Sequence, residues 1–265
     1  MSLAQLLAAA EPLAGGFRLS IPESWHQGRT AYGGLTAALA LHAARLAGGA
    51  DLPPLRSAQV SFVGPVYGTV EARARVLRRG RNAVWIAAEL LRANAQGGEV
   101  GTSATFVFMA PVENLLQLKY QAHPPGLIAV DDAPERAPPP GPARLLQHMD
   151  VRFALPRGGE AKPETCWWLR PKERDGLDLA MQLLLCADAP PPGVFAVLPR
   201  PVPPISSMTW LLNLLTPALE TRDGWWLMRV TGETSDQGCS SDRTEVWNAS
   251  GEAVALGMQS VAIFG

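Results

Sequence analysis

The chain has 265 residues, with 23 Lys and Arg against 24 Asp and Glu and a formal net charge of −1 at pH 7. This length suits one large domain or two smaller ones, each with a core of its own. The near-neutral charge excludes the electrostatic signature of a protein that binds nucleic acid or an anionic membrane surface, so we expect neither as a partner.

The sequence also lacks the usual signs of export or membrane insertion. Residues 1–10 have no basic segment and only a short apolar run, which predicts an amphipathic helix and not a signal peptide. No apolar run is long enough to cross a bilayer. Cys166, Cys186 and Cys239 are far apart and show no metal-ligand spacing, and the four histidines are scattered. We therefore expect a cytoplasmic protein in a reducing compartment, without a metal or a cofactor.

The first half of the chain predicts a helix followed by an antiparallel meander. A short strand is expected at residues 17–21, and Tyr32-Gly33-Gly34 leads into a helix of small and apolar residues at 35–47. Alternating apolar and polar side chains then predict four strands. These strands cover residues 55–66, 69–77, 83–93 and 99–110, with glycine-bearing hairpin turns at 79–82 and 96–98.

A connector is expected between the two halves, at residues 113–145. Its proline-rich part, residues 133–142, can join neither a sheet ladder nor a helix interior.

The second half repeats this plan around one very apolar helix. Residues 177–188 (Leu-Asp-Leu-Ala-Met-Gln-Leu-Leu-Leu-Cys-Ala-Asp) contain no Gly or Pro, and prolines at 190–192 end the segment. A helix that is apolar on every side is buried on every side. Its last turn carries one acid, Asp188, which either frays into solvent or points into a pocket. Strands are expected at residues 149–155, 166–169, 205–215, 225–234, 240–248 and 252–264.

Two further patterns bear on the fold. Residues 101–108 align without a gap with residues 257–264, which sets Ser103 against Gln259 and indicates an internal duplication. Each of the pairs Trp167-Trp168 and Trp225-Trp226 alternates in and out of a strand, so one member of each pair is expected at an exposed surface or an interface.

These elements predict an α+β fold, a tandem (double) hotdog in which two long helices are each wrapped by a curved antiparallel β-sheet. The expected units are an N-terminal hotdog at 1–112, the connector at 113–145 and a C-terminal hotdog at 146–265. The two sheets would join edge to edge, which removes exposed edges, and the helices would lie back to back.

Four short motifs, in this order and spacing, give the chain its resemblance to a known family. They are residues 32–34 (Tyr-Gly-Gly), 76–81 (Val-Leu-Arg-Arg-Gly-Arg), 185–188 (Leu-Cys-Ala-Asp) and 251–259 (Gly-Glu-Ala-Val-Ala-Leu-Gly-Met-Gln). With them the chain resembles the acyl-CoA thioesterases of the bacterial thioesterase II type, which are double-hotdog proteins. The resemblance covers nearly the whole chain apart from the connector.

The resemblance implies a site in which a helix Asp, a strand Ser or Thr and a Gln on the last strand hold a water against the thioester carbonyl carbon. It assigns the acid to Asp188 and the amide to Gln259. The hydroxyl position aligns most directly with Pro204 or Ile205, which have no hydroxyl, so a small register shift to Ser207 or Ser206 would be needed.

Two further groups are candidates for binding the substrate. The backbone N–H groups of Gly33 and Gly34, at the positive end of the first helix, would stabilise the carbonyl oxygen. Arg79 and Arg81, at a hairpin tip, are candidates for contact with the phosphates of coenzyme A, because the arginine fork suits phosphate.

The leading hypothesis is therefore hydrolysis of acyl-CoA thioesters. A non-catalytic acyl-CoA-binding or ligand-binding protein of the same fold is the alternative, and an enoyl-CoA hydratase is a weaker one because no histidine follows Asp188. The resemblance also implies a homodimer or a higher homo-oligomer. Acyl chain length depends on pocket depth, which the sequence does not reveal.

Overall fold

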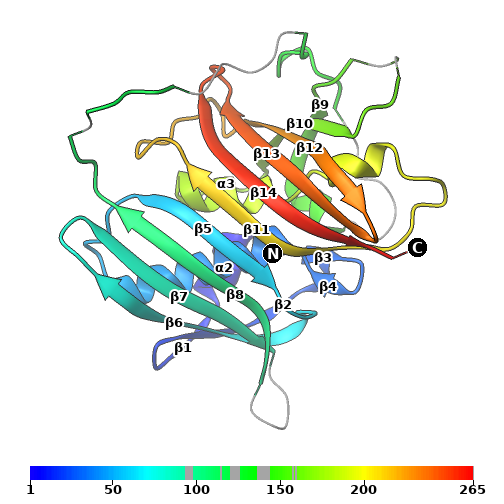
Figure 1. Ribbon diagram of the computed structural model, residues 1–265. Helices are drawn as coiled ribbons and strands as arrows, with labels where there is room; N and C mark the ends of the chain where they lie inside the picture. Colours follow the sequence, from blue (N-terminus) through cyan, green and yellow to red (C-terminus); the bar gives the residue numbers. More distant parts are fainter. Residues whose placement is uncertain are drawn as a thin grey trace.

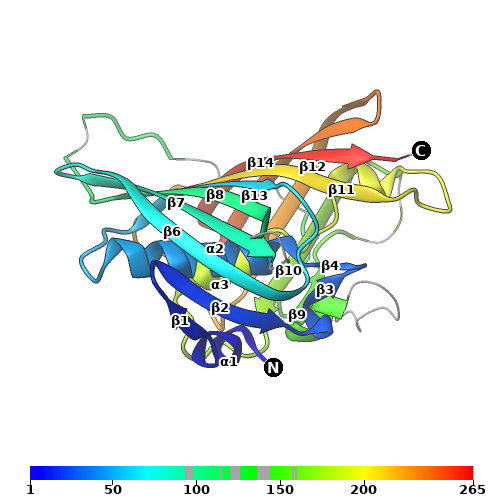
Figure 2. The same cartoon turned by 90° about the horizontal axis from the view of Figure 1, so that it is seen from below.

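The computed structural model describes residues 1–92, 98–113, 115–119, 126–135, 144–156, 158 and 160–264. Within these residues, one twelve-stranded antiparallel sheet curves over two helices, with a small two-stranded sheet beside it (Figure 1). In the view turned by 90°, α2 (Gly33–Gly48) and α3 (Leu179–Ala187) lie on the concave side of the sheet, between its central strands and the end strands β1 (Glu11–Leu13) and β2 (Gly16–Ile21) (Figure 2). The predicted α+β double-hotdog architecture is confirmed.

The observed elements follow the predicted ones closely. The helices are α1 (Leu3–Ala8), α2 (Gly33–Gly48) and α3 (Leu179–Ala187), with the 3₁₀ turns η1 (Glu23–Trp25), η2 (Arg144–His148) and η3 (Gly193–Ala196). The strands of the first half are β1 (Glu11–Leu13), β2 (Gly16–Ile21), β3 (His26–Gln27), β4 (Thr30–Ala31), β5 (Leu55–Phe62), β6 (Gly68–Arg79), β7 (Ala83–Arg92) and β8 (Glu99–Met109). Those of the second half are β9 (Met149–Phe153), β10 (Glu164–Pro171), β11 (Ile205–Leu214), β12 (Trp226–Asp236), β13 (Cys239–Asn248) and β14 (Ala253–Ile263).

The two halves join where β5 pairs with β11, at the centre of the sheet order β1-β2-β6-β7-β8-β5-β11-β14-β13-β12-β10-β9. The expected edge-to-edge junction is therefore confirmed. Most of the turn expected at residues 96–98 and most of the proline-rich segment at 133–142 lie outside the described residues.

The helix α3 is buried, as its apolar composition predicts. The carboxylate of Asp178 caps it by accepting a hydrogen bond of 3.0 Å from the backbone N–H of Met181, and every residue from there to Ala187 is buried. On the concave face of the sheet, α3 packs against α2. The last turn of α3 therefore ends inside the molecule, close to the start of α2.

One row of directly paired residues crosses the sheet from one half of the chain to the other. From the C-terminal half to the N-terminal half, it runs through Gly232, Asp242, Gln259, Trp210, Val60, Ala104, Ala88 and Ala74. The junction of β11 with β5 is at the middle of this row. Residues that pair directly across neighbouring strands point to the same face, so the residues of this row share one face of the sheet.

This row corrects the internal alignment of the sequence. Gln259 shares its face of the sheet with Ala104, whose side chain is buried, and not with Ser103, which lies on the other face of β8. Phe264, which the alignment sets against Phe108, is exposed, whereas Phe108 is buried. The gap-free alignment therefore sets inward-facing residues against outward-facing ones, as a shift by an odd number of residues does in a strand.

The expectation for the tryptophan pairs is wrong, because all four rings are buried. Trp167 and Trp226 face the helices and belong to the main core. Trp168 and Trp225 face the opposite side, where a second apolar cluster covers them. Residues 127–133, assigned from the sequence to the connector, provide much of that cluster. Both faces of the C-terminal sheet are therefore buried at this end.

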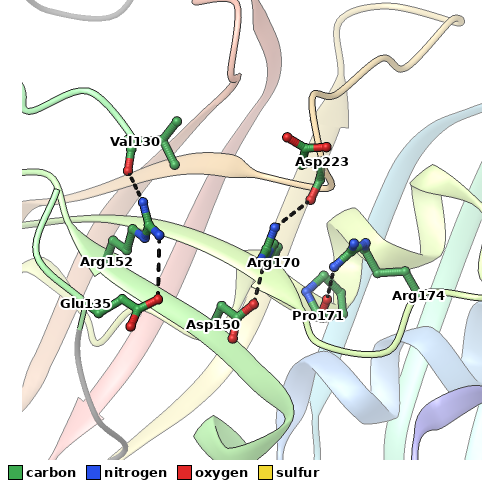
Figure 3. A network of polar contacts seen from close by, with 8 residues as sticks. All are labelled: Val130, Glu135, Asp150, Arg152, Arg170, Pro171, Arg174 and Asp223. Carbon is green, nitrogen blue, oxygen red and sulfur yellow. Dashed lines mark hydrogen bonds and ion pairs between the residues drawn. The ribbon is translucent and has the colours of Figure 1, made fainter. Parts of the chain in front are cut away.

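Arginines of β9 and β10 make polar contacts at this end of the sheet, and one of them binds the covering segment, as Figure 3 shows. Arg152 on β9 donates a hydrogen bond to the carbonyl oxygen of Val130 and forms an ion pair of 3.5 Å with Glu135. Arg170 on β10 donates to Asp150 at 2.7 Å, and its guanidinium carbon lies 4.5 Å from the ring centre of Trp225. The cover is thus held by polar contacts as well as by apolar packing.

No helix among the described residues is both long enough and apolar enough to pass through a bilayer.

Candidate active site

Three of the predicted site residues meet around one side-chain amide. The Nε2 atom of Gln259 donates one hydrogen bond of 3.0 Å to Oδ1 of Asp188 and another of 2.7 Å to Oγ of Ser207. Both amide protons are used, so the orientation of the amide is determined by its two acceptors. The Oε1 atom of the same side chain is left to accept a hydrogen bond from a ligand or a water.

Each of the three side chains is placed by its own element. Asp188 follows the last residue of α3, and the prolines at 190–192 prevent the helix from continuing. Gln259 lies on β14 with 8% of its surface exposed, and it pairs with Trp210 on β11. Ser207 lies near the start of β11 and faces the same side of the sheet.

A β-bulge brings Ser207 to this face. The pairing of β11 with β14 shifts register between Ser207 and Thr209, so Ser207 and Trp210, three positions apart, face the same way. Ser206 is exposed on the other face. Of the two serines that the sequence leaves open, Ser207 is the one in contact with Gln259. Pro204 lies before the strand and Ile205 is its first residue.

The carboxyl group of Asp188 is in an unusual electrostatic environment. Burial raises its pKa to about 7, although the amide of Gln259 and the backbone N–H of Gly34 both favour the ionised form. A titratable group close to it is Tyr32, the residue before α2, whose hydroxyl donates a hydrogen bond of 2.7 Å to the carbonyl oxygen of Leu185. Burial raises the pKa of Tyr32 well above its usual value, so this phenol stays neutral. A carboxyl group with a pKa near 7 is suited to exchange protons at neutral pH.

Gly33 and Gly34 bring the start of α2 against this carboxyl group. A methyl group on Gly33 would overlap Oδ2 of Asp188 and would lie 2.8 Å from the Phe62 ring. The side chain of the N-cap residue, Tyr32, makes no capping hydrogen bond, so the first N–H groups of α2 are directed towards the site. The positive end of a helix dipole therefore lies beside the acid.

The two arginines predicted to contact coenzyme A are not part of this cluster. Arg79 donates a hydrogen bond to the carbonyl oxygen of Gly48, the last residue of α2. Gly48 is about 22 Å from Gly33 at 1.5 Å per residue. Arg81 is exposed in the turn between β6 and β7. Both lie at the opposite end of α2 from Asp188.

Sequence reasoning missed several residues beside the site, namely Tyr32 as a side chain, Phe62 and the buried pair Ser240 and Asp242. Asp242 is directly opposite Gln259 on the neighbouring strand and is fully buried. One signal of it was available: the alternation of β13 places a charged residue among inward-facing positions.

Among the residues that the structure describes, no group of three or more His, Cys, Asp or Glu side chains is arranged to hold a metal ion.

Comparisons with known proteins extend over both halves of the chain. A family model described as the acyl-CoA thioesterase N-terminal domain matches residues 21–109, and one described as the acyl-CoA thioesterase C-terminal domain matches residues 125–263. No curated protein matches the sequence.

Several solved structures share the fold over the whole chain. A conserved protein of unknown function with a hot dog fold from Alicyclobacillus acidocaldarius has a TM-score of 0.83 and 22% identity, covering 100% of this chain and 99% of that one. The tesB protein of Mycobacterium avium subs paratuberculosis has a TM-score of 0.69 and 18% identity, covering 100% of both chains. The acyl-CoA thioesterase II TesB2 of Mycobacterium marinum has a TM-score of 0.68 and 18% identity, covering 98% of both.

Proposed function

The chain belongs to the acyl-CoA thioesterase family, and from this premise we propose that it hydrolyses acyl-CoA thioesters to a free acid and coenzyme A at the cluster of Asp188, Gln259 and Ser207. The observation that supports this site most directly is the double hydrogen bond from the amide of Gln259 to Asp188 and Ser207. It joins an acid, an amide and a hydroxyl from three separate elements.

In the proposed reaction, ionised Asp188 accepts a proton from a water molecule while the water oxygen attacks the thioester carbonyl carbon. Because Gln259 donates to Ser207, the serine proton remains free to bond to the water or to the substrate. The amide oxygen of Gln259 is a further acceptor for the same water. The C–S bond then breaks, and the proton on Asp188 passes to the departing thiolate. No covalent enzyme intermediate is needed, because a thioester is already an activated acyl group.

The developing charge on the carbonyl oxygen requires hydrogen-bond donors. The first N–H groups of α2, at Gly33 and Gly34, are proposed for this role, in keeping with their place at a helix N-terminus beside Asp188. One such donor contributes about 10²–10³ in rate. The N–H of Gly34 also interacts with the Asp188 carboxylate, so the Gly33 N–H is the better candidate.

The alternative of a non-catalytic binding protein depended on a missing hydroxyl. Ser207, within 2.7 Å of Gln259, supplies a hydroxyl and so favours the enzyme. The hydratase alternative gains no support, because no histidine follows Asp188 in the sequence.

Release of free thiol from a panel of acyl-CoA esters, from acetyl-CoA to palmitoyl-CoA, tests the proposal. We expect turnover of at least one ester, and a loss of about 10²–10⁴ in kcat for Asp188→Asn, the range typical of a general base. Wild-type protein that releases no thiol above background from any ester, while binding one of them in calorimetry, would replace the enzyme with the binding protein.

The quaternary structure and the compartment are further parts of the proposal. We propose a homodimer or a higher homo-oligomer, which light scattering would measure. A cytoplasmic location is consistent with Cys166, Cys186 and Cys239, all of which are free thiols.

A further inference from the structure

The side chain of Asp242 is completely buried on the inner face of β13, where a charged group needs specific partners. Its Oδ2 accepts a hydrogen bond of 2.7 Å from the hydroxyl of Ser240, which is also buried. Its Oδ1 accepts a hydrogen bond of 3.4 Å from the backbone N–H of Val194, and the backbone N–H of Gly193 also faces it. The carboxyl group is therefore held between its own strand and η3.

These contacts give η3 the cap that its own sequence lacks. Pro192, the N-cap residue, makes no side-chain hydrogen bond to the turn. The free N–H groups at the start of the turn are those of Gly193 and Val194, and Asp242 of the sheet accepts from them. Gly193 also has no room for a side chain, because a methyl group would overlap the backbone of Gly232 on β12. The start of η3 is thus seated on the sheet.

The segment between this anchor and Asp188 is short and stiff. Four residues, Ala189 and three prolines, separate Asp188 from Gly193, and proline has little freedom in φ. A second contact holds the middle of the segment, where the hydroxyl of Thr165 donates a hydrogen bond of 2.9 Å to the carbonyl oxygen of Pro191. A displacement of η3 would therefore also displace Asp188.

Asp242 is next to Gln259 in the row of paired residues across the sheet, and both side chains point to the same face. In the first half the same row continues through Val60, Ala104 and Ala88, which are apolar. Asp242 is therefore a polar neighbour of the candidate catalytic residue in a row that is otherwise largely apolar.

We propose that Asp242 is a positioning residue, which caps η3 and thereby holds Asp188 within reach of Gln259. Asp242 acts through its contacts with η3, and its role rests on the thioester hydrolysis proposed above.

The test compares three variants of the full chain. Asp242→Val removes both acceptor atoms and suits a strand, whereas Asp242→Asn keeps an acceptor for the η3 N–H groups. Thr244→Val is the matched control, because Thr244 is buried on the same face of β13 and also becomes Val. The measurements are kcat and KM, the pH dependence of kcat/KM, and hydrogen exchange of peptides covering residues 189–198.

We expect Asp242→Val to lose about 10²-fold in kcat with little change in KM, the effect of misplacing a catalytic group by about 1 Å. Water reaching Asp188 would lower its pKa towards the usual range, so the acid limb of kcat/KM should move to lower pH. Residues 189–198 should exchange faster. Asp242→Asn should restore all three measurements towards wild type, and Thr244→Val should leave them unchanged.

Wild-type pH dependence and exchange in Asp242→Val would overturn the inference, as would an Asp242→Asn variant no better than Asp242→Val. If Asp242→Val does not fold, Ser240→Ala removes the hydroxyl that orients the carboxylate, and it must shift the same measurements in the same direction by less. A wild type with no thioesterase activity would overturn the proposed function and the positioning role with it. Faster exchange in Asp242→Val would still support the anchoring of η3 in that case.

Discussion

Gln259 donates a hydrogen bond of 3.0 Å to Asp188, although the two residues are 71 positions apart. This contact joins the last strand of the chain to the end of α3, two elements that share no backbone ladder. It brings an acid whose pKa is about 7 into a defined orientation beside the N-terminus of α2.

The activity should depend on a single ionisation near neutral pH. Asp188 must be ionised to accept a proton, and burial raises its pKa to about 7. We expect kcat/KM to be half-maximal near pH 7 and to fall tenfold for each pH unit below about 6. Initial rates in buffers of constant ionic strength measure this profile. A rate that stays constant down to pH 5 would exclude Asp188 as the base.

The same pKa predicts how Asp188→Asn affects stability. Between pH 3.8 and about 7 the folded protein keeps a proton on Asp188 that the unfolded chain has released. The contribution of Asp188 to stability therefore decreases as pH rises through this window. Urea unfolding should show that the free energy of unfolding of Asp188→Asn, relative to wild type, is higher at pH 8 than at pH 4. An equal difference at both pH values would contradict the raised pKa.

Ser207 and Ser206 form a natural pair for testing the hydroxyl. Ser207→Ala removes one partner of the Gln259 amide, which should cost about 2- to 12-fold in kcat/KM, the effect of one hydrogen bond. Ser206→Ala, on the exposed side of the same strand, should have no effect. Thiol-release kinetics measure both. Equal rates in the two variants would show that the Ser207 hydroxyl takes no part in the reaction.

A methyl group at Gly33 should disrupt the site without unfolding the protein. The new carbon of Gly33→Ala would overlap Oδ2 of Asp188 and press on the Phe62 ring, so the acid must move. We expect a loss of about 10²-fold in kcat/KM, as for other small displacements of a catalytic group. Gly64→Ala is the control, since the nearest heavy atom to its new carbon is 3.6 Å away. Circular dichroism should show both variants folded.

Alanine variants at Arg79 and Arg81 distinguish a role in helix capping from contact with coenzyme A. Arg79→Ala removes the hydrogen bond to the Gly48 carbonyl at the end of α2, and it should lower the free energy of unfolding by about 0.5–1.5 kcal/mol. Arg81→Ala should leave stability unchanged. A higher KM for acyl-CoA in either variant would support the phosphate contact that the hairpin sequence suggests. An unchanged KM in both would exclude it.

Much of the fold could be predicted because its signals are local. The apolar helix α3 and the alternating strands were recognised within a few residues of their observed bounds. The strands β1, β3 and β4 were missed, since two or three residues are too few to show alternation. The burial of Trp168 and Trp225 was missed for a different reason. Their cover comes from residues 127–133, which carry no regular pattern that would predict where they pack.

The site residues that belong to short sequence motifs could be predicted. Asp188, Gln259, Gly33 and Gly34 were named from short motifs, and the structure brings them together. The choice between Ser206 and Ser207 required the β-bulge, which depends on how two strands pair and not on either sequence alone. Asp242 depends similarly on its contact with η3, 48 positions away.

The junction of β5 with β11 has a consequence for how the site is assembled. Both strands belong to one polypeptide, so their pairing is intramolecular and does not weaken when the protein is dilute. Gly33 and Gly34 from one half and Asp188 from the other are therefore always present at a fixed stoichiometry of one to one. Two identical single-hotdog subunits would have to carry both sets of residues in every copy. Covalent fusion removes that requirement, because each half needs to carry only its own set.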